Sequence, residues 1–265
     1  MSMKFYSITD MNSWYNIAPP KKQKEQWKCT RSAMELSRYI TDNLPEIPTA
    51  IKAALKYAGE SSNEEYEWLP EYETSLPGNG GGRNHDLIMF GKGIVVGIEA
   101  KADEPFDSNN LSSWLNEGKK NSDGGKNRKH RLDELCKLLF NEEYSEEYKN
   151  VMYQLVTALS GTIIEAKNRK KNKALFIVLS FDINEACKKT KVEKNNSDFK
   201  FFINKIGKNG KIKDEKESIN CPEIEFAGHK KYGTVDTYIV KASVKRNDLR
   251  CKDCGYRNYC DENKF

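Results

Sequence analysis

Apolar residues recur at helical spacing in the first part of the chain. Residues 31–44 place apolar side chains three and four residues apart, as on one face of a helix, and prolines follow the pattern. Residues 47–59 repeat this spacing and close with Gly59. The polar residues 1–28 lack such a pattern, so we expect them to form a loosely packed N-terminal arm.

The middle of the chain predicts a β-hairpin. Residues 86–90 and 94–102 are apolar, rich in β-branched side chains and joined by a glycine-containing turn. Weak alternation over residues 65–77 predicts an earlier strand. Residues 173–181 form a nearly continuous apolar run, typical of a central strand, and residues 234–246 alternate as a last strand.

The segments between these strands predict helices. Residues 145–171 carry an apolar stripe made of Met152, Leu155, Val156, Leu159 and Ile163. Residues 108–140 combine two helical pieces with a basic, glycine-rich loop at 118–130, and the lysine-rich residues 187–220 are helical in part. This order predicts an α/β fold, with a mixed sheet covered by helices on both faces, in one domain over residues 29–250.

Composition narrows the class of protein. Of the 265 residues, 31% are charged and 37% hydrophobic, which leaves enough apolar material for a core. No apolar run reaches about 18 residues, and the N-terminus lacks the apolar centre of a secretory signal. We therefore expect no membrane span and a cytoplasmic location, where the seven cysteines would not form a disulfide framework. The net charge of +5 permits a nucleic-acid partner without demanding one.

Three charged residues interrupt the apolar hairpin. Asp86 opens its first strand and Glu99 lies near the end of the second, so an antiparallel pairing makes them neighbours. Lys101 stands two residues after Glu99 and shares its face of the strand. Two adjacent carboxylates suit Mg²⁺ or Mn²⁺, and an amine beside them can orient a water or offset charge. These groups together suit phosphodiester hydrolysis, and the simpler alternative is a surface salt bridge at a strand end.

The pattern Asp86-x12-Glu99-Ala-Lys101 resembles the signature of the PD-(D/E)XK nuclease superfamily. The residue before the aspartate is His85, where the signature has proline. The resemblance to a bacterial branch of this superfamily extends over residues 27–181. It implies a restriction endonuclease-like core, a mixed sheet flanked by helices, and metal-dependent cleavage of DNA or RNA. Asp86 and Glu99 would then bind the metal, and Lys101 would assist attack by water.

The resemblance implies further residues at the site. Glu35 stands where family members carry a metal-binding glutamate on the first core helix. Gln154 is similar to the glutamine of the RecB-like Q-x3-Y element, although Ala158 replaces the tyrosine. Glu71 on the first strand is a weaker candidate. For Glu35 the alternative is a solvated helical glutamate, and for His85 the alternating direction of strand side chains predicts that it points away.

Three cysteines gather at the C-terminus, in residues 251–265, which we expect to pack as a knuckle on the same domain. Cys251, Cys254 and Cys260 have the spacing of three metal ligands, and a fourth must come from elsewhere. The spacing resembles the cluster of RecB-like exonucleases, which implies a [4Fe–4S] cluster completed by Cys29. The alternatives are Zn²⁺, with Cys221 or His229 as the fourth ligand, and a tail of reduced cysteines.

The expected partner is a nucleic acid. Basic residues concentrate in four segments, at 21–28, 118–131, 167–173 and 188–196, and those that share the face of Asp86 would form a phosphate-binding groove. We expect a DNA nuclease acting in restriction, phage defence or repair, with DNA preferred to RNA. The alternative is a non-cleaving module that binds nucleic acid or protein on the same fold. The sequence is compatible with a homo-oligomer and leaves endonuclease and exonuclease action open.

Overall fold

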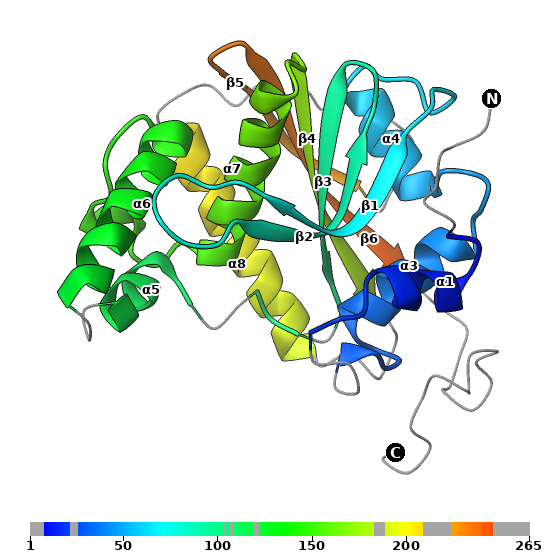
Figure 1. The fold of residues 1–265 in the computed structure, drawn as a ribbon, viewed down its shortest axis with the longest axis horizontal. Coiled ribbons are helices and arrows are strands. Elements are labelled where there is room, and N and C mark those ends of the chain that lie inside the picture. Colours follow the sequence, from blue (N-terminus) through cyan, green and yellow to red (C-terminus); the bar gives the residue numbers. More distant parts are fainter. Residues whose placement is uncertain are drawn as a thin grey trace.

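The structure is a computed structural model that describes residues 8–21, 26–102, 104–106, 109–118, 122–182, 189–208 and 224–245. Its centre is a six-stranded sheet in the order β1-β2-β3-β4-β6-β5 (Figure 1). The strands are β1 (Glu67–Thr74), β2 (Arg83–Phe90), β3 (Ile94–Lys101), β4 (Lys173–Asp182), β5 (Ile224–Tyr232) and β6 (Val235–Lys245). The predicted α/β class with a mixed sheet is therefore confirmed.

Strand direction divides the sheet into three parts. β1, β2 and β3 form an antiparallel meander, β3, β4 and β6 run parallel, and β5 returns antiparallel to β6. All eight residues of β3 are buried, as expected for a parallel strand covered on both faces. The predicted hairpin of β2 and β3 is thus confirmed, and its second strand lies inside the sheet.

Helices cover both faces of the sheet, as predicted. One face packs against α1 (Met11–Ile17), α3 (Ser32–Thr41) and α4 (Thr49–Tyr57). The other packs against α5 (Leu111–Gly118), α6 (Ser122–Phe140), α7 (Tyr153–Asn168) and α8 (Lys189–Lys208), with the short helix η1 (Glu146–Tyr148) before α7. Figure 1 shows these two layers on opposite sides of the strands. The two apolar clusters meet at the sheet and hold α3 and α7 against it.

Helix α7 approaches the sheet closely because two glycines, Gly97 and Gly161, leave space at their contact. A Cβ on Gly97 of β3 would lie 2.1 Å from the Thr162 hydroxyl, and one on Gly161 of α7 would lie 2.3 Å from the Thr74 hydroxyl. Any larger residue at either position would push the helix outward. This close packing sets the position of the first turn of α7 beside the end of β3.

Two expectations were wrong. The described part of the N-terminal arm is packed, since Met11, Trp14 and Trp27 belong to the core and Asp10 caps α1. Residues 122–130, expected in a loop, are the start of α6, where Lys129 forms an i,i+4 ion pair with Asp133.

Strand β5 is an element that the sequence pattern did not indicate. Its alternation is weak because Gly228 interrupts it and a register shift lies between Phe226 and Gly228. It is an edge strand, with β6 as its only neighbour in the described sheet.

Candidate active site

The pairing of β1, β2 and β3 aligns three carboxylates. The pairing of β2 with β3 runs up to Leu87 and Ile98, and Asp86 and Glu99 are the residues directly beyond that last pair. On the other side, Pro70 pairs with Leu87 and Tyr72 with His85, which sets Glu71 opposite Asp86. Glu71 has a left-handed φ of 51°, and its backbone interrupts the ladder at that point. One row across three strands thus carries Glu71, Asp86 and Glu99.

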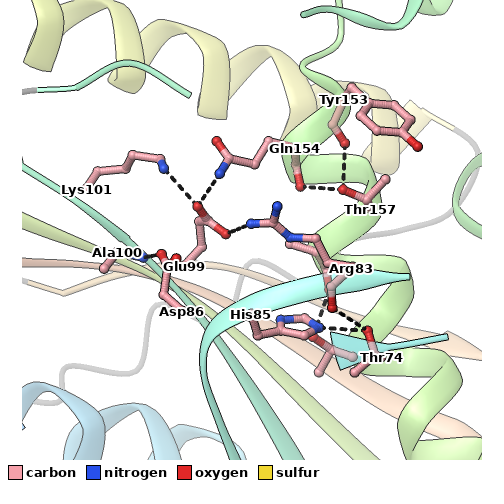
Figure 2. Close-up of polar contacts among 12 residues, drawn as sticks. Thr74, Arg83, His85, Asp86, Glu99, Ala100, Lys101, Tyr153, Gln154 and Thr157 are labelled. Carbon is pink, nitrogen blue, oxygen red and sulfur yellow. Dashed lines mark hydrogen bonds and ion pairs between the residues drawn. The ribbon is translucent and has the colours of Figure 1, made fainter. Parts of the chain in front are cut away.

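Asp86 and Lys101 lie where the hairpin predicted. The Oδ2 atom of Asp86 accepts a hydrogen bond from the Ala100 backbone N–H at 2.7 Å, which ties β2 to β3 beside Glu99. The Nζ atom of Lys101 donates to Glu99 Oε1 at 2.8 Å, and both side chains are buried. Figure 2 shows the three side chains converging at the end of β3.

Gln154 reaches the same carboxylate from α7. Its Nε2 atom donates to Glu99 Oε1 at 2.5 Å, which places Gln154 beside the acidic pair, and its role in the site stays a prediction. The Thr157 hydroxyl donates to the carbonyl oxygens of Tyr153 and Gln154, at 3.0 and 3.1 Å (Figure 2). The first turn of α7 therefore holds Gln154 toward the sheet.

Arg83 is a site residue that the sequence pattern did not reveal. It opens β2, and its Nη2 atom forms an ion pair with Glu99 Oε2 (Figure 2). The available signal was its position on the same strand as Asp86, three residues earlier. Because Lys101 and Arg83 both bond to Glu99, that carboxylate is neutralised from two sides.

The pKa values of the two central carboxyl groups, Asp86 and Glu99, are shifted in opposite directions. Burial raises the pKa of Asp86 to about 8, and the negative charge of Glu99 adds to this, against the lowering effects of Lys101 and Arg83. Burial also opposes ionisation of Glu99, yet the charges of Arg83 and Lys101 outweigh it and lower its pKa. The pKa of Glu71 is raised by burial and by Glu99.

His85 is not part of this acidic row. Its ring points away from Asp86, as expected, and Nε2 lies 3.1 Å from the Thr74 hydroxyl (Figure 2). Burial lowers the pKa of His85 to about 3, so the ring is neutral at pH 7. It fills the narrow space beneath α7, next to Gly97 and Gly161.

The Glu35 side chain is buried, and it accepts a hydrogen bond from a residue close to it in the sequence. It is buried on α3, and its Oε1 atom accepts a hydrogen bond from the Thr30 N–H at 3.1 Å. Its role as a metal ligand stays a prediction. The nearby Glu104 caps the start of α3, since its Oε1 atom accepts from the Ser32 N–H at 2.9 Å.

Of the cysteines predicted as metal ligands, Cys29 is the one that lies within the described residues. Cys29 is buried, 8% exposed, and forms no disulfide. Cys221, Cys251, Cys254 and Cys260, with the whole predicted knuckle, lie outside the described residues. His229, the other candidate zinc ligand, stacks on Tyr238 and has its Nε2 atom 3.5 Å from Asp236.

The carboxylates of Glu71, Asp86 and Glu99 are the candidate ligands for a divalent cation. Within the described ranges, no three His, Cys, Asp or Glu side chains come together as a group that could hold a metal ion. Two carboxylates nevertheless fit Mg²⁺, which keeps several waters and takes one or two protein carboxylates together with substrate oxygens. The pKa of Asp86 is raised mainly by burial and also by the charge of Glu99, and a cation between the two carboxylates would oppose this effect.

The predicted basic segments do not all share this face. Residues 167–173 lie at the amino end of β4, the edge opposite to Glu99, and Lys173 there pairs with Glu60. Residues 189–196 belong to α8, which covers the face that carries Lys101. Lys21, from the segment at 21–28, also lies near the site, since its charge lowers the pKa of Glu71.

Comparison with known proteins places the chain in a family. No curated protein and no solved structure matches it. No helix in the described ranges is both long and apolar enough to cross a membrane. A family model described as a domain of unknown function matches residues 7–239, most of the chain. The chain therefore belongs to the DUF6946 family.

Proposed function

We propose that this protein is a metal-dependent nuclease that hydrolyses phosphodiester bonds, with DNA as the preferred substrate. The observation that carries the proposal is the meeting of Asp86, Glu99 and Lys101 at the end of β3, with Lys101 donating to Glu99 at 2.8 Å. The strand order and the flanking helices are compatible with the restriction endonuclease-like core that the sequence resemblance implies.

Each side chain has a separate task. Asp86 and Glu99 would hold Mg²⁺ or Mn²⁺, which when bound supplies an activated water and stabilises charge on the phosphate. Lys101 is placed to orient the attacking water or to offset charge in the transition state. Gln154 positions the Glu99 carboxylate. The guanidinium of Arg83 has the planar, two-pronged geometry that suits a phosphate.

One observation favours the alternative, a module that binds nucleic acid without cutting it. Both oxygens of Glu99 already bond to side-chain donors, Lys101 and Gln154 on Oε1 and Arg83 on Oε2. Such a carboxylate has less charge to offer a metal. The nuclease and the module share the fold and differ in whether Mg²⁺ or Mn²⁺ promotes cleavage.

Cleavage assays on circular and linear DNA separate the two. The wild type, Asp86→Ala, Lys101→Ala and a surface control, Lys129→Ala, are incubated with Mg²⁺, Mn²⁺ or EDTA. We expect cleavage by the wild type and the control only, and only with metal. Nicking of closed circles would show endonuclease action, whereas degradation of linear DNA alone would show exonuclease action. Equal activity in all four proteins, or DNA binding without cleavage by the wild type, would overturn the nuclease assignment.

The cysteine site forms a separate part of the proposal. We propose a [4Fe–4S] cluster or Zn²⁺ held by Cys251, Cys254, Cys260 and Cys29, whose thiol is buried and not oxidised to a disulfide. Anaerobically purified protein should be brown if the metal is iron–sulfur and colourless with stoichiometric zinc if it is not. Cys29→Ser should lower the metal content, and an unchanged content would remove Cys29 from the site.

A further inference from the structure

A pocket opens at the carboxyl ends of the parallel strands, next to the acidic row. Its volume is about 460 Å³, and its floor is formed by the ends of β3, β4 and β6. Helix α8 contributes one wall, with Asn195, Asn196 and Lys200. Ligands of open α/β sheets bind at this edge, beyond the carboxyl ends of the strands.

The strand register joins this pocket to the proposed active site. Lys101 pairs with Ser180, and Ser180 pairs with Ser243, so the three residues form one row that lines the pocket. Two residues earlier along each strand, and on the same face, Glu99 pairs with Val178, and Val178 pairs with Lys241. Lys241 therefore lies on the same face as Glu99 two strands away, roughly 10 Å across the sheet. Lys101 belongs to both the site and the pocket.

The pocket lining is positively charged. It contains the lysines Lys101, Lys200, Lys241 and Lys245 against the acids Asp182 and Glu225. Lys101 already has Glu99 as its counter-charge. The remaining lysines leave a positive surplus in a concave space beside the bond-breaking groups, which suits an anion.

Lys241 is the most informative of these residues. It is only 7% exposed, and its Nζ atom donates to the neutral amide oxygen of Asn196. Burial lowers the pKa of Lys241, and the charge of Glu225, its partner across β5 and β6, opposes this without overcoming it. A buried ammonium is costly when its counter-charge offsets the burial only in part, so the fold keeps a cation there at the expense of stability.

We propose that the pocket holds a phosphate-bearing nucleotide of the nucleic-acid strand, next to the bond that is cut, with Lys241 and Lys200 binding its phosphate. This inference rests on the proposed function and names a subsite of it. The volume lies in the range that encloses a small ligand. The Asn196 amide and the hydroxyls of Ser180 and Ser243 can offer hydrogen bonds to the sugar and the base. Asn195 is part of the wall, with its amide bonded to the Phe106 N–H and the Glu104 carbonyl oxygen.

The test measures binding without metal, so that cleavage plays no part. Anisotropy of fluorescein-labelled oligonucleotides in EDTA is followed for the wild type, Lys241→Gln and Lys200→Gln. The matched control is Lys194→Gln, a lysine on the same helix whose partner is Asp198. We expect each pocket variant to bind roughly five- to tenfold more weakly and to lower the salt slope by about one, with the control unchanged. Lys200 is exposed, so its variant remains informative if the Lys241 variant fails to fold.

Two further measurements show whether the pocket recognises a phosphate and whether that phosphate is terminal or internal. Thymidine 5′-monophosphate should compete with the oligonucleotide in the wild type, and thymidine should not. A 5′-phosphorylated strand that binds more tightly than a 5′-hydroxyl strand, only when Lys241 is present, assigns a terminal phosphate; equal binding assigns an internal one. Both results support the pocket.

The outcomes also separate the two proposals. Unchanged affinity and salt slope in both pocket variants overturn the subsite, even if the wild type cleaves DNA in Mg²⁺. Weaker binding by the variants, together with no cleavage by the wild type, supports the subsite and overturns the nuclease.

Discussion

Two buried lysines lie on the same face of the sheet, and their pKa values are shifted in opposite directions. Lys101 on β3 and Lys241 on β6 are 5% and 7% exposed, and their Nζ atoms lie 5.6 and 5.9 Å from the rings of Phe106 and Phe199. Burial acts to lower the pKa of both. Glu99 and Asp86 nevertheless raise the pKa of Lys101, whereas the pKa of Lys241 stays lowered.

The difference lies in the hydrogen-bond acceptor. Lys101 donates to a carboxylate, which compensates its charge within the protein, and Lys241 donates to an amide, which does not. A compensated charge is part of the folded site and is positioned before substrate arrives. An uncompensated one can instead be neutralised by a ligand, which is why the two lysines are assigned to chemistry and to binding.

The largest expected effect comes from removing the compensated lysine. Lys101→Met leaves the buried Glu99 with one ion-pair partner, Arg83, and the neutral donor Gln154. It should destabilise the protein by about 3 kcal/mol, because breaking a buried ion pair leaves part of the charge of Glu99 uncompensated. Urea unfolding at pH 7 measures the change. Lys52→Met, which removes an exposed partner of Glu46, should cost far less, because solvent screens an exposed ion pair. Equal losses of stability in both variants would contradict the conclusion that Glu99 compensates the charge of Lys101.

A smaller effect is expected from Asp86→Asn, and it depends on pH. The pKa of Asp86 is raised to about 8, so between its ordinary value of 3.8 and pH 8 the folded protein binds more protons than the unfolded chain. Wild-type stability should therefore fall as the pH rises through this range. Asparagine can still accept from the Ala100 N–H, so the variant lacks this fall and should be the more stable at pH 8, by on the order of 2 kcal/mol.

Thermal unfolding at pH 5 and pH 8 checks this prediction. Without metal, the gap between Asp86→Asn and the wild type should be small at pH 5 and wide at pH 8. Adding Mg²⁺ at pH 8 should stabilise the wild type alone, because the variant has lost a carboxylate ligand. A gap that does not change with pH would rule out a raised pKa at Asp86.

The smallest effect, with the opposite sign to the first, is expected at the uncompensated lysine. Lys241→Met should stabilise the ligand-free protein by about 1 kcal/mol at pH 7, since a buried cation held by an amide is replaced by an apolar chain of similar length. The lowered pKa of Lys241 also makes wild-type stability rise with pH toward the ordinary lysine value of 10.5, a rise that the variant lacks.

Unfolding curves with and without thymidine 5′-monophosphate complete this comparison. The nucleotide should raise the melting temperature of the wild type and leave Lys241→Met nearly unchanged. Lys200→Met, an exposed lysine of the same pocket, should show the weaker nucleotide response without the gain in stability. Destabilisation by Lys241→Met as large as that by Lys101→Met would show that the two lysines are equivalent.

The sequence by itself determined the local elements and the central part of the site. Two apolar, β-branched runs at 86–90 and 94–102, joined by a glycine-containing turn, predicted the hairpin. Its short turn brings Asp86 near Glu99, and the alternation of strand side chains places Lys101 on the face of Glu99. The helical stripe of 145–171 predicted α7 and, with the family resemblance, Gln154. These relations depend on neighbours in the chain or across one tight turn.

Tertiary structure alone decided what depends on strand order. Arg83 and Glu71 joined the site through the β1–β2 register, and Lys241 became its neighbour because β6 lies beside β4. A lysine between Val240 and Ala242 was a visible anomaly in the sequence, yet its place was set by pairings between residues more than 60 positions apart. Local periodicity carries no information about such long-range pairings, because every strand with the same pattern could occupy the same place in the sheet.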